Sequence, residues 1–332
     1  MVLQTALKSF QRSSDELPHI ITSNLEHDSV RIVLEKFVQD GLAEVTFVPA
    51  SLTSGRVEVD TVTAAVKPNT CLVSIMMANN ETGVIQPIED ISRAVKALNH
   101  GPRQILMHTD AAQCIGKIPV RVPDLAVDYL TVVGHKFYGP RIGALYVRKP
   151  GSKTPLLPIF YGGGQERNFR SGTENTPMIA GLGMAAHLVC ENLPRYQNMM
   201  KESRDQMEYM LRKLVTNSSN PGLGISINGK YASSQRLPNT LNFAFVGANS
   251  AKTLGRSVLE KVSDLQAGVG AACHSGSGVR ASPVLLASGV PEEAARNAIR
   301  LSFGREEISV KDIQSIAERL CNAAESLQQV SE

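Results

Sequence analysis

Short apolar runs alternate with amphipathic segments over the first half of the chain. The apolar runs predict strands at residues 19–23, 44–49, 71–78, 104–108, 128–133 and 143–147. The segments between them carry the polar and apolar spacing of helices at residues 29–40, 59–65 and 87–98. This alternation predicts an α/β fold with a mostly parallel sheet and helices on both of its faces.

The second half of the chain follows a different pattern. A helix is predicted from about residue 177, followed by a long charged helix at residues 195–215. Further strands are expected at residues 240–245 and 300–304, and further helices at residues 251–261, 292–299 and 310–328. We therefore expect a large domain over residues 1–192 and a smaller α+β domain over residues 193–332.

Composition narrows the possible partners. The 332 residues are 42% hydrophobic and 20% charged, and a net charge of +3 is too small to indicate nucleic-acid binding. No apolar run reaches the roughly 18–20 residues of a membrane span. The five cysteines are dispersed without CxxC spacing, which argues against a disulfide framework or a structural zinc site. We expect a cytoplasmic protein without a bound metal, a nucleic-acid partner or a membrane partner.

Three polar residues follow predicted strands directly: Asn80, Asp110 and Lys136. Ligands bind at the carboxyl ends of parallel strands, so we expect these residues to face one crevice. A lysine desolvated at the mouth of a buried strand has a lowered pKa and can form a Schiff base, although a single lysine at such a position is more often a surface residue. Asp110 could pair with a protonated pyridine nitrogen, as in pyridoxal phosphate (PLP) enzymes, or could cap a helix.

Three other residues are candidates for chemistry. His27 could stack on a cofactor or act as an acid or base, or it could be a polar loop residue. Cys273 lies among small residues, which favours an accessible thiol beside His274, and no second ligand cluster supports a metal site there. Arg300 could bind a substrate carboxylate through two hydrogen bonds, or form an ordinary salt bridge.

Eight sequence blocks carry a family resemblance. In order they are EHDSV (26–30), ANNETGVIQP (78–87), HTDAAQ (108–113), GHKFYGPRIGALY (134–146), GGGQERNFRSGTENTP (162–177), LPNTLNF (237–243), GAACHS (270–275) and RLSFGR (300–305). Together they resemble the NifS-like cysteine desulfurase and selenocysteine lyase family, which are class V aminotransferases of PLP fold type I. The resemblance runs from about residue 19 to the C-terminus, and it implies a PLP cofactor and a homodimer.

The resemblance implies how the cofactor is held and used. Lys136 would bond to PLP and later move the Cα proton of the substrate. Asp110 would pair with the pyridine nitrogen, Gln113 would hydrogen-bond the phenolic oxygen, and His27 would stack on the ring.

It also implies contacts to the phosphate and to the substrate. His135 would contact the phosphate, and Thr173 would reach the phosphate of the neighbouring subunit. Asn80 and Arg300 would hold the substrate carboxylate. Cys273, in the smaller domain, would be the mobile-loop cysteine that meets the substrate's selenium or sulfur.

The implied reaction is the decomposition of L-selenocysteine to L-alanine with release of reduced selenium, which a selenium acceptor protein could take up. L-cysteine would be a poor substrate or an inhibitor. One alternative is a cysteine desulfurase that supplies persulfide sulfur, and another is an inactive, shortened isoform that acts through dimer association.

Two departures from the family pattern bear on these expectations. The residue before Gly134 is often a phosphate-binding serine in the family, and here it is Val133. The family's Gly-Thr-x-Glu-Ser-Asn-Asn segment, whose helix N-terminus holds the phosphate, has no counterpart before His19. We therefore expect the large domain to be truncated at its front, with an exposed sheet edge and a weakened cofactor site.

Overall fold

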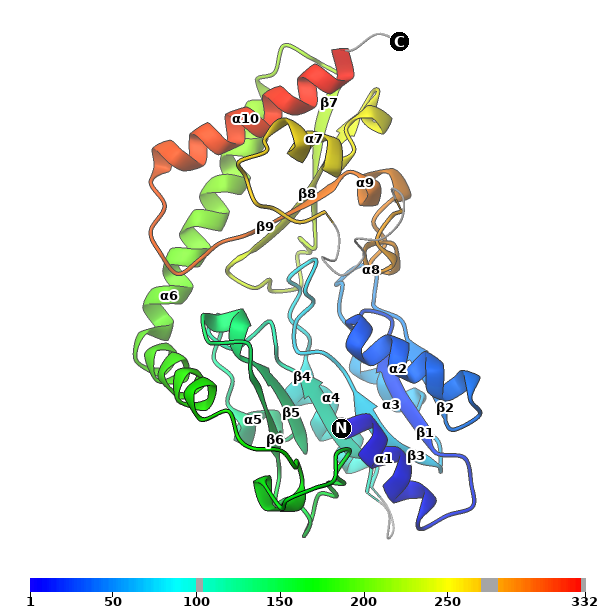
Figure 1. Ribbon diagram of the computed structural model, residues 1–332. Coiled ribbons are helices and arrows are strands. Elements are labelled where there is room, and N and C mark those ends of the chain that lie inside the picture. Colours follow the sequence, from blue (N-terminus) through cyan, green and yellow to red (C-terminus); the bar gives the residue numbers. More distant parts are fainter. Residues whose placement is uncertain (100–103, 270–279, 330–332) are drawn as a thin grey trace. The chain divides into compact units, whose positions relative to one another are not determined.

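The computed structural model describes residues 1–99, 104–269 and 280–329 (Figure 1). The chain forms two compact units. The first contains residues 1–51, 56–79 and 86–192, and the second contains residues 52–55, 80–85 and 193–332. Two short segments from the first part of the chain, 52–55 and 80–85, thus belong to the second unit.

The first unit is built on a six-stranded sheet with the order β2-β1-β3-β4-β5-β6. Its strands are β1 (His19–Ser23), β2 (Glu44–Val48), β3 (Thr70–Ser74), β4 (Leu106–Asp110), β5 (Tyr129–Val133) and β6 (Gly143–Val147). Strands β1 to β5 run parallel to one another, and β6 is antiparallel to β5. The predicted α/β fold with a mostly parallel sheet is therefore confirmed.

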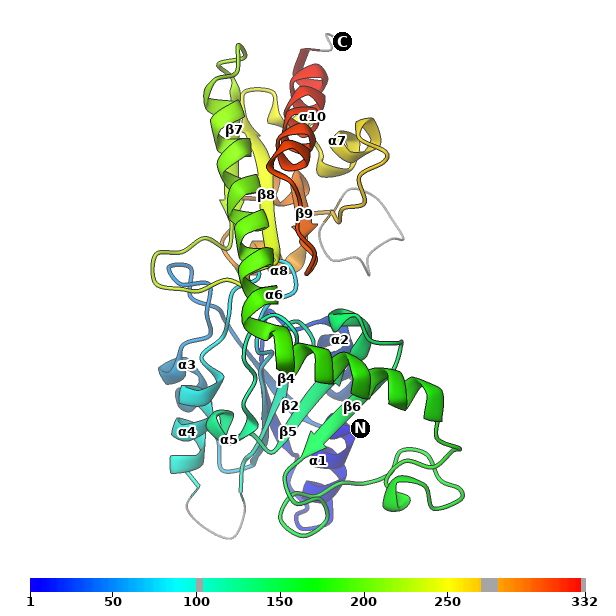
Figure 2. The ribbon, with the colours of Figure 1, turned by 90° about the vertical axis from the view of Figure 1, so that its left-hand side faces the viewer.

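Helices cover both faces of this sheet. They are α1 (Val2–Gln11), α2 (Asp28–Gln39), α3 (Val59–Ala64), α4 (Ile88–Ala97) and α5 (Val122–Leu125). Helices α1 and α2 lie on one face, and α3, α4 and α5 lie on the other (Figures 1 and 2). Apolar side chains of α1, α2, β1 and β3 form one buried cluster, which includes Phe10, Leu34, Ile20 and Leu72.

Helix α1 was not among the predicted elements. Its apolar residues Leu3, Leu7 and Phe10 recur every three to four positions and are buried against the sheet. This spacing is the signature of an amphipathic helix, so the signal was present in the sequence.

The second unit contains a three-stranded antiparallel sheet with the order β7-β8-β9. Its strands are β7 (Leu223–Asn228), β8 (Thr240–Gly247) and β9 (Ala298–Ser302), and its shorter helices are α7 (Gly255–Lys261), α8 (Pro283–Ala287) and α9 (Glu292–Arg296). Helix α10 (Val310–Gln329), α7 and the second half of α6 (Thr176–Thr216) pack their apolar side chains on this sheet. Phe243 and Phe245 lie fully buried at its centre, with their rings in an edge-to-face contact.

The structure differs from the predicted elements at three places in this half of the chain. The two helices expected from residue 177 and at 195–215 are one 41-residue helix, α6, which contains Pro194. Proline removes one backbone hydrogen bond from a helix and kinks it, and α6 is sharply bent partway along its length (Figure 2). Strand β7 was not predicted, and β9 begins at Ala298, so the helix expected at 292–299 already ends at Arg296.

Among the described residues, none of the helices combines the length and the apolar character that a membrane span requires.

Candidate active site

Asp110 and Lys136 lie at the same edge of the six-stranded sheet. Asp110 is the last residue of β4 and is paired in register with Thr131 of β5. Lys136 belongs to the single 3₁₀ turn η1 (Gly134–Phe137) that follows β5 directly. Because β4 and β5 are adjacent and parallel, their carboxyl ends deliver both side chains to one edge.

The carboxylate of Asp110 is mostly buried and has positive charges near it. Burial raises its pKa, whereas the N–H of Ala112 and the charges of His27 and Lys136 lower it. The Oδ1 atom accepts a hydrogen bond of 2.9 Å from the Ala112 N–H. The capping function considered for Asp110 is thus present, and it leaves the second carboxylate oxygen available for another donor.

The turn that carries Lys136 is fixed by its backbone. The N–H of Gly134 donates to the carbonyl of Ile142 at 2.8 Å, and a Cβ at Gly134 would lie 2.6 Å from that carbonyl oxygen. Only glycine fits this position without moving the backbone. The side chain of Lys136 is exposed, so the burial that the sequence led us to expect for it is absent. The lysine amine is accessible rather than desolvated.

His27 directly precedes helix α2. Its Nδ1 atom accepts a hydrogen bond of 3.2 Å from the Ser29 N–H, so the ring acts as the N-cap of the helix. The neighbouring Glu26 is only 2% exposed, and its Oε1 atom accepts hydrogen bonds from Ser23 Oγ at 2.6 Å and from the Met76 N–H at 2.9 Å. Glu26 thereby attaches the loop that carries His27 to the chain that follows β3.

Glu26 is a buried carboxyl group close to Asp110. Burial raises its pKa to about 8, and the charge of Asp110 adds to this effect. Its Oε2 atom is buried and has no hydrogen-bond partner among the described residues. The protonated form therefore dominates at neutral pH, and one polar atom remains unsatisfied.

Three further predicted residues belong to the first unit. Gln113 is half-buried in the turn after Asp110, and His135 and Thr173 are exposed. Partial desolvation lowers the pKa of His135, and the charges of Lys136 and Arg141 lower it further.

The second unit brings Asn80 and Arg300 together. The Nη1 atom of Arg300, on β9, donates a hydrogen bond of 2.9 Å to the backbone carbonyl of Asn80. The side-chain Oδ1 of Asn80 is buried and has no hydrogen-bond partner in the described structure. Gly268 pairs with Arg300 through two backbone hydrogen bonds of 2.7 and 3.0 Å. Cys273, also expected to act on the substrate, lies outside the described residues.

The family model for class V aminotransferases ("Aminotransferase class-V") matches residues 2–315. The chain belongs to the class V aminotransferase family. This class V aminotransferase is 51% identical to the selenocysteine lyase of Xenopus laevis over 341 residues, covering 98% of this chain and 78% of that protein. It is 34% identical to the cysteine desulfurase IscS of Rickettsia felis, covering 94% of this chain and 71% of that protein. Among solved structures, a NifS-like protein of 32% identity superposes with a TM-score of 0.78, covering 99% of this chain and 78% of that one.

Class V aminotransferases are PLP-dependent enzymes, and the residues of the first unit fit that cofactor. Asp110 offers a mostly buried carboxylate with one free oxygen, which suits a protonated pyridine nitrogen. Lys136 offers an exposed amine at the same edge of the sheet, which suits the cofactor's aldehyde. Among the described residues, no group of three or more His, Cys, Asp or Glu side chains could hold a metal ion.

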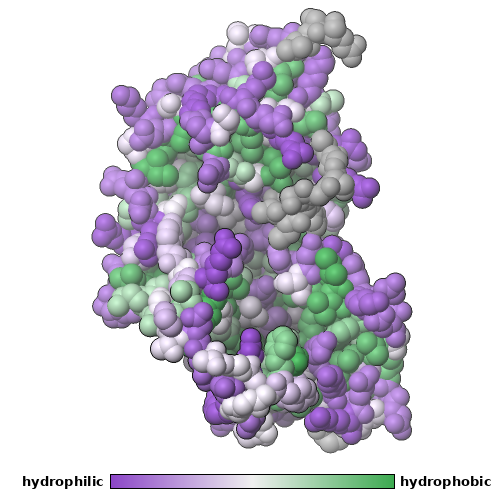
Figure 3. Space-filling view, in the orientation of Figure 1, coloured by the Kyte–Doolittle hydropathy of each residue, from purple (hydrophilic) through white to green (hydrophobic). Residues whose placement is uncertain are grey.

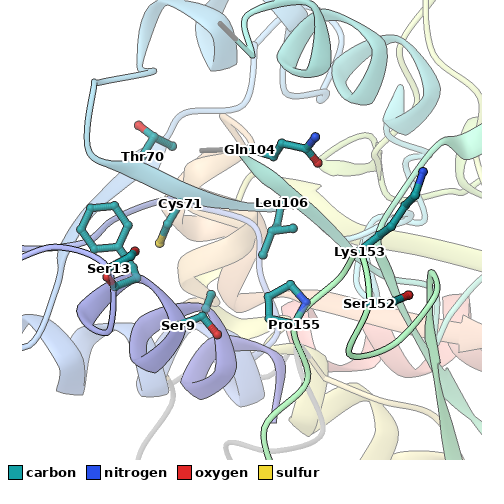
Figure 4. A pocket seen from close by; sticks show the side chains of 11 residues that line it. Ser9, Ser13, Thr70, Cys71, Gln104, Leu106, Ser152, Lys153 and Pro155 are labelled. Atoms are coloured by element: carbon teal, nitrogen blue, oxygen red, sulfur yellow. Dashed lines mark hydrogen bonds between the residues drawn. The ribbon is translucent and has the colours of Figure 1, made fainter. Parts of the chain in front are cut away.

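A separate cavity of about 460 Å³ lies at the opposite edge of the same sheet (Figure 4). Thr70 and Leu106, the first residues of β3 and β4, line it together with Ser9, Cys71 and Lys153. Asp110 is at the other end of β4, so this cavity is not the candidate active site.

Sequence reasoning missed two residues near the site, Glu26 and Lys117. Glu26 stands next to His27 in the block EHDSV, which gave a positional hint. Lys117 is 7% exposed and follows Asp110 by seven residues, in a segment whose sequence also suits a surface turn. Its burial becomes visible only in the structure.

Proposed function

We propose that this class V aminotransferase is a PLP-dependent lyase that converts L-selenocysteine to L-alanine and releases reduced selenium. The observation that carries the proposal is the placement of Asp110 and Lys136 at the ends of adjacent parallel strands. The choice of substrate is supported by a higher identity to the selenocysteine lyase of Xenopus laevis than to the cysteine desulfurase of Rickettsia felis.

The residues of the first unit would hold the cofactor and move a proton. PLP, when bound, withdraws electrons from the Cα atom of an amino acid. Asp110 would keep the pyridine nitrogen protonated through its free oxygen, and Gln113 would donate to the phenolic oxygen. His27 would stack on the ring, while His135 and, in the neighbouring subunit, Thr173 would contact the phosphate. The amine of Lys136 would take the Cα proton of the substrate.

Residues of the second unit would bind the substrate. The guanidinium of Arg300 is suited to a carboxylate, and the buried Oδ1 of Asn80 still has an unused acceptor. Cys273 would meet the selenium atom. The Cβ–Se bond would then break with its electron pair staying on carbon, which takes up a proton to give alanine, while the selenium atom passes to the Cys273 sulfur. Release of elemental selenium balances this reaction, whereas release as selenide requires a reductant such as a thiol.

Selenium selectivity would come from the strength of the bond that breaks rather than from the size of the pocket. The carbon–selenium bond is weaker than the carbon–sulfur bond, and the selenol is already ionised at neutral pH. Selenium and sulfur are so similar in size that a pocket would separate them poorly by shape. We therefore propose L-cysteine as a poor substrate or an inhibitor.

The direct test is the formation of alanine from L-selenocysteine by the purified chain with PLP. Lys136→Ala is expected to lower the rate at least about 100-fold by removing the proton-transfer group. Lys153→Ala, a lysine at the other edge of the sheet, serves as the control and should leave the rate unchanged. The absence of alanine from the folded, PLP-supplied wild type would contradict the proposal and favour a non-catalytic role.

We also propose that the chain acts as a cytosolic homodimer that passes selenium to an acceptor protein. Large apolar side chains are exposed on the first unit, including Tyr138, Phe160, Tyr161 and Met184. Figure 3 shows hydrophobic patches among hydrophilic residues on the surface of the first unit. Such surface suits a subunit contact. Four described cysteines, three of them buried, are free thiols, which suits a reducing compartment.

A further inference from the structure

Lys117 is a buried lysine beside the backbone of Lys136. It is 7% exposed, and its Nζ atom donates a hydrogen bond of 3.2 Å to the carbonyl of Lys136. In the part of the chain that the structure describes, no carboxylate lies within salt-bridge distance of this nitrogen. The hydrogen bond to Lys136 is thus the interaction that anchors its ammonium group.

The residue before Lys117 makes a second contact with the same turn. Gly116 has a φ of +79°, and a Cβ there would lie 2.6 Å from the Cβ of Phe137. The chain can approach η1 this closely only with glycine at this position. Two consecutive residues therefore contact two consecutive residues of η1.

The segment between Asp110 and Lys117 is itself fixed. The N–H of Cys114 donates to the carbonyl of Ala111 at 2.9 Å, and the N–H of Lys117 donates to the carbonyl of Cys114 at 3.0 Å. Lys117 therefore connects the segment that starts at Asp110 to the turn that holds Lys136.

A buried lysine destabilises the fold because its ammonium group must be desolvated. Burial lowers the pKa of Lys117 to about 8, which reflects the cost of desolvating its charge. An apolar side chain of similar length fills a buried position without that cost, and replacing buried charges in this way is often neutral or stabilising. The hydrogen bond to the Lys136 carbonyl explains why a lysine, and not an apolar residue, occupies this buried position.

We propose that Lys117 is a positioning residue that holds the backbone carbonyl of Lys136 and so fixes the point from which the Lys136 amine reaches the cofactor. This inference rests on the proposed function, in which Lys136 bonds to PLP. It predicts that loss of the Lys117 donor weakens cofactor attachment without weakening the fold.

The test compares Lys117→Met with Lys117→Arg and with a matched control, Lys96→Met. Lys96 is 26% exposed in its side chain and pairs with Asp128 at 3.2 Å, just before β5 and away from η1. Two readouts are used: the dissociation constant of PLP from equilibrium dialysis, and the yield of borohydride-trapped PLP on the Lys136 peptide by mass spectrometry. The thermal midpoint of each protein without PLP is recorded beside them.

Lys117→Met is expected to raise the PLP dissociation constant at least about tenfold and to lower the trapped yield, because small displacements of a reacting group have large effects. Its thermal midpoint without PLP should be unchanged or higher. Lys117→Arg keeps a donor and should recover part of the affinity. Lys96→Met removes the nearer of the two cations beside Asp128 and leaves Arg148 at 3.8 Å, so it should lower the thermal midpoint and leave the PLP affinity unchanged.

A Lys117→Met protein that binds and traps PLP like the wild type would overturn the inference. Lys117→Leu, which also lacks a donor, replaces the methionine variant if the latter does not fold. An unchanged PLP dissociation constant and unchanged trapping in Lys117→Leu overturn the inference in the same way. A wild type that traps no PLP on Lys136 contradicts the proposed function instead, so the two failures are distinguishable.

Discussion

The buried carboxyl of Glu26 accepts a hydrogen bond of 2.9 Å from the backbone N–H of Met76, which joins the loop after β1 to the chain after β3. The unfolded chain loses the Glu26 proton near pH 4.5, whereas the folded chain holds it until about pH 8. Between these values the folded state binds the extra proton, so its stability falls as the pH rises. The loss is on the order of 5 kcal/mol at most.

Glu26→Gln should remove this loss, because glutamine stays neutral and its oxygen accepts the same two hydrogen bonds. We expect the variant to be close to the wild type near pH 5 and more stable at pH 8, measured by urea unfolding at both values. Glu35→Gln on the exposed face of α2 is the control and should show no such difference. A variant destabilised equally at both pH values would show that Glu26 is not held protonated.

The buried ring of His108 should make the folded state less stable as the pH falls, which is the opposite of the effect of Glu26. Its ring is buried between Ser74 Oγ and Thr131 Oγ1, at 2.8 and 3.0 Å, and burial, with a smaller effect from the amino terminus, lowers its pKa to about 4. Between pH 6.5 and 4 the unfolded chain binds a proton that the folded chain does not, so stability falls as the pH falls, by about 3 kcal/mol.

His108→Gln should therefore lose less stability than the wild type between pH 6.5 and 4, even though it is less stable at pH 7. Urea unfolding across this range gives the slope for each protein. His187→Gln, on an exposed part of α6, should keep the wild-type slope. An unchanged slope in His108→Gln would exclude His108 as the source of the acid sensitivity.

Gly268 leaves room for the guanidinium of Arg300. A Cβ at this position would lie 3.1 Å from Arg300 Nη2, so Gly268→Ala should displace the guanidinium by a few tenths of an ångström. We expect the KM for L-selenocysteine to rise about threefold to tenfold, with a smaller change in kcat, because Arg300 binds the substrate in the proposed function. Gly183→Ala, whose Cβ would meet nothing within 4 Å, is the control. Equal KM values for wild type and Gly268→Ala would contradict this role of Arg300.

The strands of the first unit were predictable because each is a short, nearly continuous apolar run bounded by polar residues. Their parallel arrangement then placed Asp110 and Lys136 at one edge, which periodicity and general rules of α/β sheets suffice to predict. Helix α6 was divided in the prediction because Pro194 interrupts the helical pattern, whereas an internal proline can kink a helix without ending it.

Other features depend on contacts between distant residues. No local sequence pattern indicates that residues 80–85 belong to the second unit. There the N–H of Leu237 donates a hydrogen bond of 2.8 Å to the Gly83 carbonyl. The burial of Glu26 and of Lys117 arises in the same way, from strands and turns that meet only in the folded chain. The shared crevice expected for Asn80, Asp110 and Lys136 stays a prediction, as do the roles of Cys273 and Thr173.

Turnover of L-selenocysteine and of L-cysteine under identical conditions, with PLP, a thiol reductant and alanine as the measured product, decides whether this chain is a selenocysteine lyase. A selenocysteine lyase should show a kcat/KM for L-selenocysteine at least about 100-fold above that for L-cysteine, because the weaker carbon–selenium bond lowers the barrier to cleavage. Equal values for the two substrates, or a preference for L-cysteine, would contradict a selenocysteine lyase and favour a cysteine desulfurase.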